Sequence, residues 1–234
     1  MKYMHRSIAA ACILSMLAGS IAFTAAAAPN TVSAPTAAPV TSSAVPNIGY
    51  SSIPTTIQRI MMNVSFNKKT PLQMKDLSYV KVRYIGFDNK THTGELIIHK
   101  KLAKDVFDIF EELYSKRYPI EKIQLIDQYK GSDDLSMKAN NTSAFNTRVI
   151  AGKKSLSNHS YGIAIDINPL QNPHVSRNKV SPTSAKAYAN RTVARKGMII
   201  KGDACYTAFK KRGWSWGGEW KSSKDYQHFE KKIK

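Results

Sequence analysis

The sequence predicts an α+β domain in which a small antiparallel sheet is flanked by helices. Two segments near the start of the folded part are rich in apolar residues that alternate or cluster as they do in strands. Apolar residues at helical spacing follow them, and strands and helices do not alternate strictly along the chain. A hydrophobic fraction of 42% with 9% aromatic residues can build a core, so the composition excludes wholesale disorder.

The predicted elements begin with two strands and a helix. The patterns in Leu77–Phe87 and Gly94–His99 predict strands that pair across the polar residues 88–90. A helix follows, and Pro119 closes it because proline cannot continue a helix. The apolar residues at helical spacing are Leu102, Val106, Ile109, Phe110 and Leu113.

Shorter elements complete the folded part. Residues 123–126 and 161–167 are predicted strands, and residues 184–195 and 204–212 are predicted helices. Residues 131–158 are polar and irregular, which predicts a loop. A loop of that length in a compact domain is usually functional or disordered.

A basic start, an apolar middle and an alanine-rich end mark residues 1–28 as a predicted secretory signal peptide. An uncleaved membrane anchor is the alternative, because about twenty apolar residues can just span a bilayer. The small residues near the end of the run favour cleavage. We therefore expect a secreted or cell-envelope protein, in the periplasm or cell wall, without a stable membrane span after cleavage.

Residues 29–54 contain five of the ten prolines and no charged residue, which predicts a disordered linker. The folded body is therefore expected over residues 55–234. The two cysteines of the sequence exclude a disulfide scaffold and a four-thiolate zinc site. Cys205 would be the only thiol after cleavage of the leader, and we expect it to be buried.

The charge of the chain is strongly positive, +19 in all. Residues 59–234 carry +17 of it, because only Lys2 and Arg6 among the charged residues come earlier. Such a charge attracts polyanions, which for an exported bacterial protein are anionic cell-wall polymers or membrane-surface phosphates. Nucleic acid is the general alternative, but the sequence has no recognised nucleic-acid-binding motif. We therefore expect no specific nucleic-acid partner.

Candidate catalytic residues first occur around the predicted strand 161–167. Its three isoleucines point to one face, the core, while Gly162, Ala164 and Asp166 point to the other. The two very small side chains leave space for a ligand beside the carboxylate of Asp166. His159 lies just before the strand, where a bend could bring its imidazole beside that carboxylate.

A second group of candidates lies near the end of the chain, where Asp225 precedes His228 by three residues. A catalytic zinc site needs three protein ligands plus a water, and hydrolysis needs a carboxylate beside that water. His159, Asp166 and His228 could supply the ligands and Asp225 the base. Spacing alone leaves a structural role open for each of them. The three tryptophans within residues 214–220 are, on their own, more often core than cleft.

These residues carry a resemblance to a known family. The string Ser157-x-His159-x-x-Gly162-x-Ala164-x-Asp166, with the later Asp225-x-x-His228, resembles the zinc D-alanyl-D-alanine carboxypeptidase family. That family includes vancomycin-resistance dipeptidases and carboxypeptidases and phage L-alanyl-D-glutamate endopeptidases, and it shares its fold with the hedgehog signalling domain. Similarity covers about residues 78–230. Segments on either side of this motif resemble the secreted bacterial members of the family in particular. They are residues 140–148, Ala151-Gly152, Asp166-Ile167-Asn168-Pro169 and 214–220.

The resemblance implies a hedgehog/DD-peptidase-like fold and one Zn²⁺ ion held by His159, Asp166 and His228. It gives Asp225 the place of the general base, where many relatives have glutamate. Relatives also use an upstream arginine to stabilise the oxyanion. Arg148 is the candidate here, with Lys130 as the competitor and a solvated structural role as the alternative. The expected substrate-binding residues are Ser157, Tyr161, Trp216 and Trp220.

The implied function is hydrolysis of peptide bonds in peptidoglycan stem peptides, by a D,D- or L,D-carboxypeptidase or endopeptidase. The alternative is a non-catalytic, zinc-stabilised module of the same fold that binds the cell wall. A basic nucleic-acid-binding protein with a merely structural His/Asp set is the third class. His92 and His99 are expected to be structural or exposed, and His174 to lie at most at the rim of the site.

Overall fold

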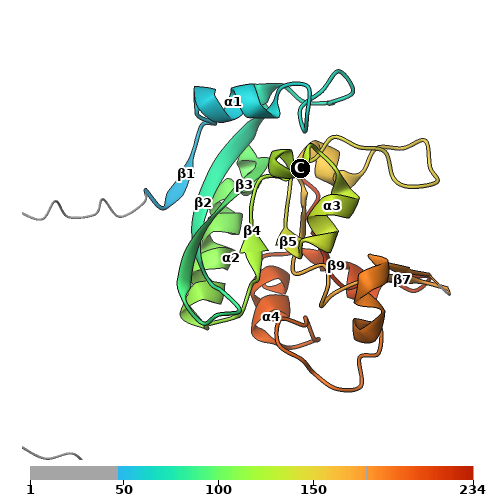
Figure 1. The fold of residues 1–234 in the computed structure, drawn as a ribbon. Helices are drawn as coiled ribbons and strands as arrows, with labels where there is room; N and C mark the ends of the chain where they lie inside the picture. Colours follow the sequence, from blue (N-terminus) through green and yellow to red (C-terminus); the bar gives the residue numbers. More distant parts are fainter. Residues whose placement is uncertain (1–46, 178, 234) are drawn as a thin grey trace, which may run out of the picture. The chain divides into compact units, whose positions relative to one another are not determined.

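The computed structural model describes residues 47–177 and 179–233 of the chain. The predicted signal peptide and residues 29–46 of the predicted linker lie outside the described residues. Within the described part the chain has several small sheets and a few helices, so the predicted α+β class is confirmed (Figure 1). Among these residues, no helix combines the length and hydropathy that a membrane span requires.

The predicted hairpin is confirmed. Strand β2, Leu77–Ile85, pairs antiparallel with β3, Thr91–His99, so that Leu77 faces His99 and Ile85 faces Thr91. The turn between them is closed locally, because the Asp88 carboxylate accepts a hydrogen bond from the backbone N–H of Lys90. Such a side-chain contact is typical of aspartate in turns.

The folded body begins earlier than predicted. Gly49–Ser51, which we placed in the disordered linker, form strand β1 and pair with β2 in the order β1-β2-β3. The ring of Tyr50 lies 6.0 Å from that of Phe107, measured between centroids. The end of the predicted linker is therefore ordered by strand pairing and by this aromatic contact. Its composition alone does not reveal either interaction.

Helix α2, Ala103–Ser115, packs along one face of this sheet (Figure 1). Its apolar stripe is fully buried, as the helical spacing predicts. The chain leaves the helix at Lys116, three residues before Pro119. The main core lies between these elements: it contains Val106, Ile109, Phe110 and Leu113 of α2 and Val80, Val82, Leu96 and Ile98 of the sheet.

Three further small sheets carry the second half of the fold. One has the order β6-β11-β9, with Ala164–Asp166, His228–Glu230 and Ser215–Trp216. Another has the order β10-β7-β8, with Lys224–Asp225, His174–Ser176 and Lys179–Ser181. A two-stranded parallel sheet pairs β4, Lys122–Ile123, with β5, Asn141–Thr142.

The remaining helices are short. They are α1 at Thr55–Met61, α3 at Asp133–Lys138 and α4 at Ala204–Lys210. Asp203 caps α4 by accepting a hydrogen bond of 2.7 Å from the backbone N–H of Tyr206. Short 3₁₀ segments lie at Met74–Asp76, Lys100–Leu102, Ile126–Tyr129, Asn158–Tyr161, Thr183–Tyr188 and Gly217–Glu219.

Four predicted elements are wrong in extent. The predicted strand 161–167 is only Ala164–Asp166, because Tyr161 still belongs to the preceding 3₁₀ turn. The predicted helix 184–195 is only a 3₁₀ segment that ends at Tyr188, because the Asn190 side chain accepts a hydrogen bond from the backbone N–H of Thr192 and forms a turn instead. The predicted strand 123–126 stops early, since the Asn141 side chain bonds both backbone groups of Gln124. The predicted loop 131–158 contains α3 and β5.

Cys205 is buried and unpaired within the described part of the chain, as predicted. It lies on α4, inside the main core. Burial raises the pKa of its thiol well above the usual range, so the thiol stays protonated and unreactive at neutral pH.

Removal of the Phe209 ring is expected to destabilise the fold strongly. This α4 side chain is fully buried and stacks on Phe229 with ring centroids 4.0 Å apart, while Trp214 meets it edge-on. Phe209→Ala should lower the free energy of unfolding by about 3–5 kcal/mol, measured by urea denaturation. Val193→Ala, at a side chain that is 65% exposed, is the control and should change it by less than about 0.5 kcal/mol. A loss below about 1 kcal/mol for Phe209→Ala would contradict this packing.

Candidate metal centre

The pairing of β6 with β11 brings two polar residues together that are far apart in the sequence. Asp166 of β6 lies directly opposite His228 of β11. Ile165 and Ile167, on the other face of the strand, are fully buried in the main core. The face assignment predicted from the alternation is therefore confirmed, and the carboxylate of Asp166 points away from the core.

A tight turn before β6 positions His159. The residue lies in the 3₁₀ turn Asn158–Tyr161, where the Ser157 hydroxyl accepts a hydrogen bond from the His159 backbone N–H. Gly162 ends the turn with φ = 61°, and a Cβ there would lie 2.7 Å from the backbone nitrogen of His99. Glycine is therefore needed on both counts for the chain to turn back into β6.

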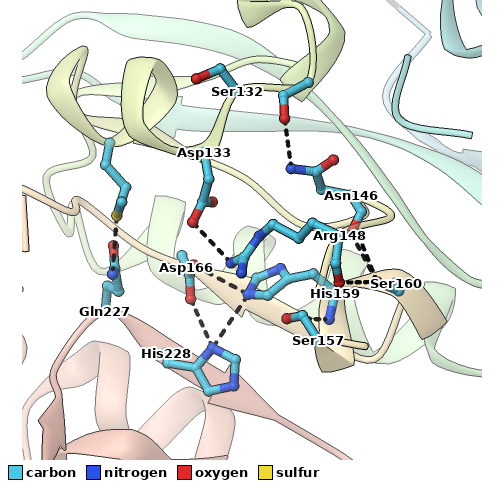
Figure 2. Close-up of polar contacts among 12 residues, drawn as sticks. Ser132, Asp133, Asn146, Arg148, Ser157, His159, Ser160, Asp166, Gln227 and His228 are labelled. Atoms are coloured by element: carbon cyan, nitrogen blue, oxygen red, sulfur yellow. Dashed lines mark hydrogen bonds and ion pairs between the residues drawn. The ribbon is translucent and has the colours of Figure 1, made fainter. Parts of the chain in front are cut away.

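The three side chains meet in one buried cluster (Figure 2). Asp166 Oδ2 lies 3.2 Å from His159 Nε2, and Asp166 Oδ1 lies 2.9 Å from His228 Nδ1. The two histidine nitrogens are 3.3 Å apart. The sequence thus predicts a group that the structure brings together and that could hold a metal ion.

Outer contacts orient both imidazole rings. His159 Nδ1 donates a hydrogen bond to the Ala144 carbonyl oxygen, and His228 Nε2 donates one of 3.0 Å to Glu230. The second nitrogen of each ring therefore faces Asp166. Metal-binding histidines are held in the same way, with one ring nitrogen donating to a carbonyl or carboxylate and the other left for the metal. Asn158 in turn donates to the same Glu230 oxygen at 2.6 Å.

The donor set and its spacing fit zinc. Two imidazole nitrogens and one carboxylate are a common ligand set of catalytic zinc sites, which leave a fourth position open. Tetrahedral ligand atoms at about 2.0–2.1 Å from one zinc ion lie about 3.3 Å from one another. Here one donor atom from each of the three residues lies within 4.8 Å of the other two, so the three ligands can converge on one ion.

Electrostatics make this centre attractive to a cation. Burial alone would raise the pKa of Asp166, but His159 and His228 hold it well below its usual range, so the carboxylate stays charged. Burial disfavours a charged imidazole at His228, yet hydrogen bonds to Asp166 and Glu230 raise its pKa to about 10. The cluster therefore binds positive charge, either a proton or a metal ion.

Asp225 lies beside the cluster and borders the same cavity of about 520 Å³. Its Oδ1 atom is buried and accepts no hydrogen bond within residues 47–177 and 179–233. Burial raises the pKa of this carboxyl, Asp166 adds to the rise, and His228 opposes it. Gly217 packs closely behind the residue, since a Cβ there would lie 2.5 Å from the Asp225 carbonyl oxygen.

Arg148 borders the cavity as well. Its Nη2 lies 3.1 Å from Asp133 Oδ2, and its backbone N–H donates a hydrogen bond to the Ser160 hydroxyl (Figure 2). The buried Nε of Arg148 has no hydrogen-bond partner within the described residues. Lys130, the competing candidate, is exposed at the end of a 3₁₀ turn and does not border the cavity.

Only two of the four expected substrate-binding residues reach the cavity. Ser157 and Trp220 line it, and the Trp220 ring lies 5.4 Å from that of His228. Trp216 is instead buried in the main core, where its indole N–H donates to the Tyr226 carbonyl oxygen. Tyr161 is exposed outside the cavity. The expectation for Trp216 and Tyr161 is therefore not supported by their positions.

The other histidines differ in their surroundings. His92 is half-buried and contacts Asp88, and His99 is buried, where its Nδ1 accepts a hydrogen bond from the backbone N–H of Lys101. His174 lines the cavity and faces Asp225 across the β7–β10 pair, which places it at the rim as expected.

Sequence reasoning missed the acidic partners of two site residues. Asp133, the partner of Arg148, lies in a segment expected to be an irregular loop, and no spacing rule links the two. Glu230, the partner of His228, could have been found. The two are separated by one residue in a strand, and residues at that spacing share a face.

Comparison with known proteins agrees with this geometry. Residues 151–231 match the model of a protein family described as D-alanyl-D-alanine carboxypeptidase. The matched segment includes His159, Asp166, Asp225 and His228 and excludes Arg148. The family implies the hedgehog/DD-peptidase fold, in line with the α+β architecture. No solved structure matches the chain significantly.

Proposed function

We propose, from the D-alanyl-D-alanine carboxypeptidase family domain that residues 151–231 form, that this protein is a zinc-dependent peptidase acting on peptidoglycan stem peptides. One observation carries the proposal. A buried cluster of two imidazole nitrogens and a carboxylate shares its cavity with a second carboxylate, that of Asp225, whose Oδ1 has no partner within the described residues.

In this proposal His159, Asp166 and His228 hold one zinc ion. When bound, zinc supplies Lewis acidity, which polarises the carbonyl group of the scissile peptide bond and acidifies water. The protein fixes the two imidazole donors in advance, His159 through the Ala144 carbonyl and His228 through Glu230. Such contacts keep ligand orientation constant during turnover.

Asp225 would act as the general base and then the general acid. Its Oδ1 takes a proton from the attacking water as the new carbon–oxygen bond forms. The same oxygen then gives the proton to the departing amine nitrogen as the carbon–nitrogen bond breaks. The raised pKa of Asp225 suits both steps, because the carboxyl can hold the proton between them.

Arg148 would stabilise the negative charge that develops on the carbonyl oxygen. A guanidinium fixed beside the reacting carbonyl can do this without reorganising, because its position is set beforehand. Here Asp133 holds one end of the guanidinium, and the backbone of Arg148 is bonded to Ser160 and Ser157.

Arg148→Ala is accordingly expected to lower turnover of a stem peptide by roughly 10²–10³-fold with the bound metal retained. Steady-state turnover and zinc content should be measured on the same preparation. Lys130→Ala removes one exposed positive charge outside the cavity and should leave turnover within about twofold. Near-normal turnover of zinc-loaded Arg148→Ala would exclude this role.

The alternative, a non-catalytic zinc-stabilised module that binds the cell wall, has a simple distinguishing mark. It needs no free carboxylate beside the metal ligands, whereas Asp225 lies there with a buried oxygen that has no partner within the described residues. Export to the cell envelope and attraction to anionic wall polymers belong to the proposal, the latter because residues 59–234 carry a net charge of +17.

Digestion of purified peptidoglycan tests the proposal directly. Muropeptides released with and without a zinc chelator should be compared by mass spectrometry. We expect chelator-sensitive mass losses that identify the bond as D,D or L,D and the enzyme as a carboxypeptidase or an endopeptidase. Peptidoglycan that binds the protein but keeps all its stem peptides would favour the non-catalytic module.

A further inference from the structure

A second cavity, of about 530 Å³, adjoins the metal cavity. Two of its residues, Ser176 and Ser223, line both cavities, so a ligand in one can extend into the other. We call the second cavity the anion subsite. The residues that line it are Ser176, Arg177, Lys179, Ser222 and Ser223.

The anion subsite is lined by positive charge and hydroxyl groups, without a carboxylate. Within residues 47–177 and 179–233, neither Arg177 nor Lys179 has an ion pair or a side-chain hydrogen bond, whereas some other cations of the fold do. Examples are Arg83 with Glu111 and Lys210 with Glu219. Two neighbouring cations without a counterion attract an anionic group.

The hairpin formed by β7 and β8 explains why these charges lie together. Ser176 pairs with Lys179 at the end of the hairpin, and Arg177 lies in the turn between them. The local sequence offers them no acidic neighbour, because Asp166 is the only acidic residue between positions 135 and 202. The positive charge of the hairpin is therefore not neutralised along its own stretch of chain.

The distance from the metal cavity can be derived from the strand. His174 faces Asp225, and Arg177 directly follows the end of β7, three residues after His174. At about 3.3 Å per residue of strand, this separation is at most roughly 10 Å. An extended peptide has nearly the same rise, so it would cover the distance with about three residues.

We propose that the anion subsite binds a carboxylate of the substrate peptide about three residues away from the scissile bond. This inference rests on the proposed peptidase function and deepens it, because it assigns the substrate an acidic substituent distant from the reacting carbonyl. Arg177 can bind such a carboxylate through two parallel N–H donors, Lys179 adds a point charge, and the serine hydroxyls can donate further hydrogen bonds.

The test measures binding of two synthetic stem pentapeptides, one with free side-chain carboxylates and one with these amidated, both with a free C-terminus. Isothermal titration calorimetry on the full-length, zinc-loaded Asp225→Asn protein avoids hydrolysis. We expect the acidic peptide to bind about tenfold more tightly, as two partly exposed ion pairs allow. In the Arg177→Ala/Lys179→Ala double variant of the same Asp225→Asn protein, the ratio of the two dissociation constants should fall close to one.

Lys186→Ala is the matched control, since it removes an exposed cation that lies outside both cavities, and it should keep the tenfold preference. Equal affinity for the two peptides, no binding of either, or a preference that survives the double substitution would overturn the proposal. Turnover by the unsubstituted protein is scored separately. A tenfold preference without hydrolysis of either peptide would support the subsite and refute the peptidase function.

Discussion

Replacement of His159 by alanine is expected to abolish zinc binding and peptide hydrolysis together. The change leaves two donors, Asp166 and His228, where a catalytic zinc site needs three. Asp166 would keep only one of its two histidine partners, so its buried charge would be poorly compensated. Zinc per chain by mass spectrometry and turnover of a stem peptide should both fall below detection.

The control for this experiment is His92→Ala. His92 is half-buried and lies outside the cavity, where it contacts Asp88 and the Tyr84 ring, so its loss should leave zinc content and turnover unchanged. Circular dichroism should show both variants folded. A folded His159→Ala protein that still carries one zinc ion per chain would show that the ligand assignment is wrong.

Replacement of Asp225 by asparagine is expected to separate metal binding from chemistry. Asparagine keeps nearly the same shape and leaves the three ligands in place, but the amide cannot take a proton from the attacking water. Turnover should fall by roughly 10²–10⁴-fold, the usual contribution of general acid–base catalysis, with zinc still bound. Zinc content, circular dichroism and turnover measured on one preparation test this expectation.

Asp88→Asn provides a matched control, because it makes the same chemical change at an exposed site outside the cavity. It should keep normal turnover. If zinc-loaded Asp225→Asn hydrolyses the peptide at a rate near that of the unsubstituted protein, the general-base role is refuted. Unfolding of this variant would instead show that Asp225 serves the structure of the β7–β10 pair.

The parts of the fold that could be predicted are those in which one local pattern decides the structure. The hairpin of β2 and β3 and helix α2 bury a continuous apolar face, so their periodicity is strong. The predictions fail where a side chain from a distant part of the sequence takes the backbone hydrogen bonds that would otherwise continue a strand. Asn141 ends β4 by bonding Gln124 across 17 residues, and nothing in the local sequence around Gln124 reveals this.

The site shows the same limit. His159, Asp166 and His228 could be assigned because a family resemblance supplied the long-range information that spacing lacks. The partner of Arg148, Asp133, could not, since their ion pair depends on how two irregular segments fold against each other. An aromatic-rich segment is equally ambiguous, and the structure divides it between the core, with Trp216, and the cavity, with Trp220.

The pairing of β6 with β11 makes metal binding sensitive to strand alignment. Asp166 faces His228 in one register only. A slip by one residue would set Asp166 against Phe229 or Gln227 and turn its carboxylate toward the opposite face of the sheet. Only the correctly aligned chain can then gain the free energy of zinc binding, because that free energy is part of the folding free energy. The ion would thus favour the native register of β11 against β6 during folding, and this effect would not depend on any substrate.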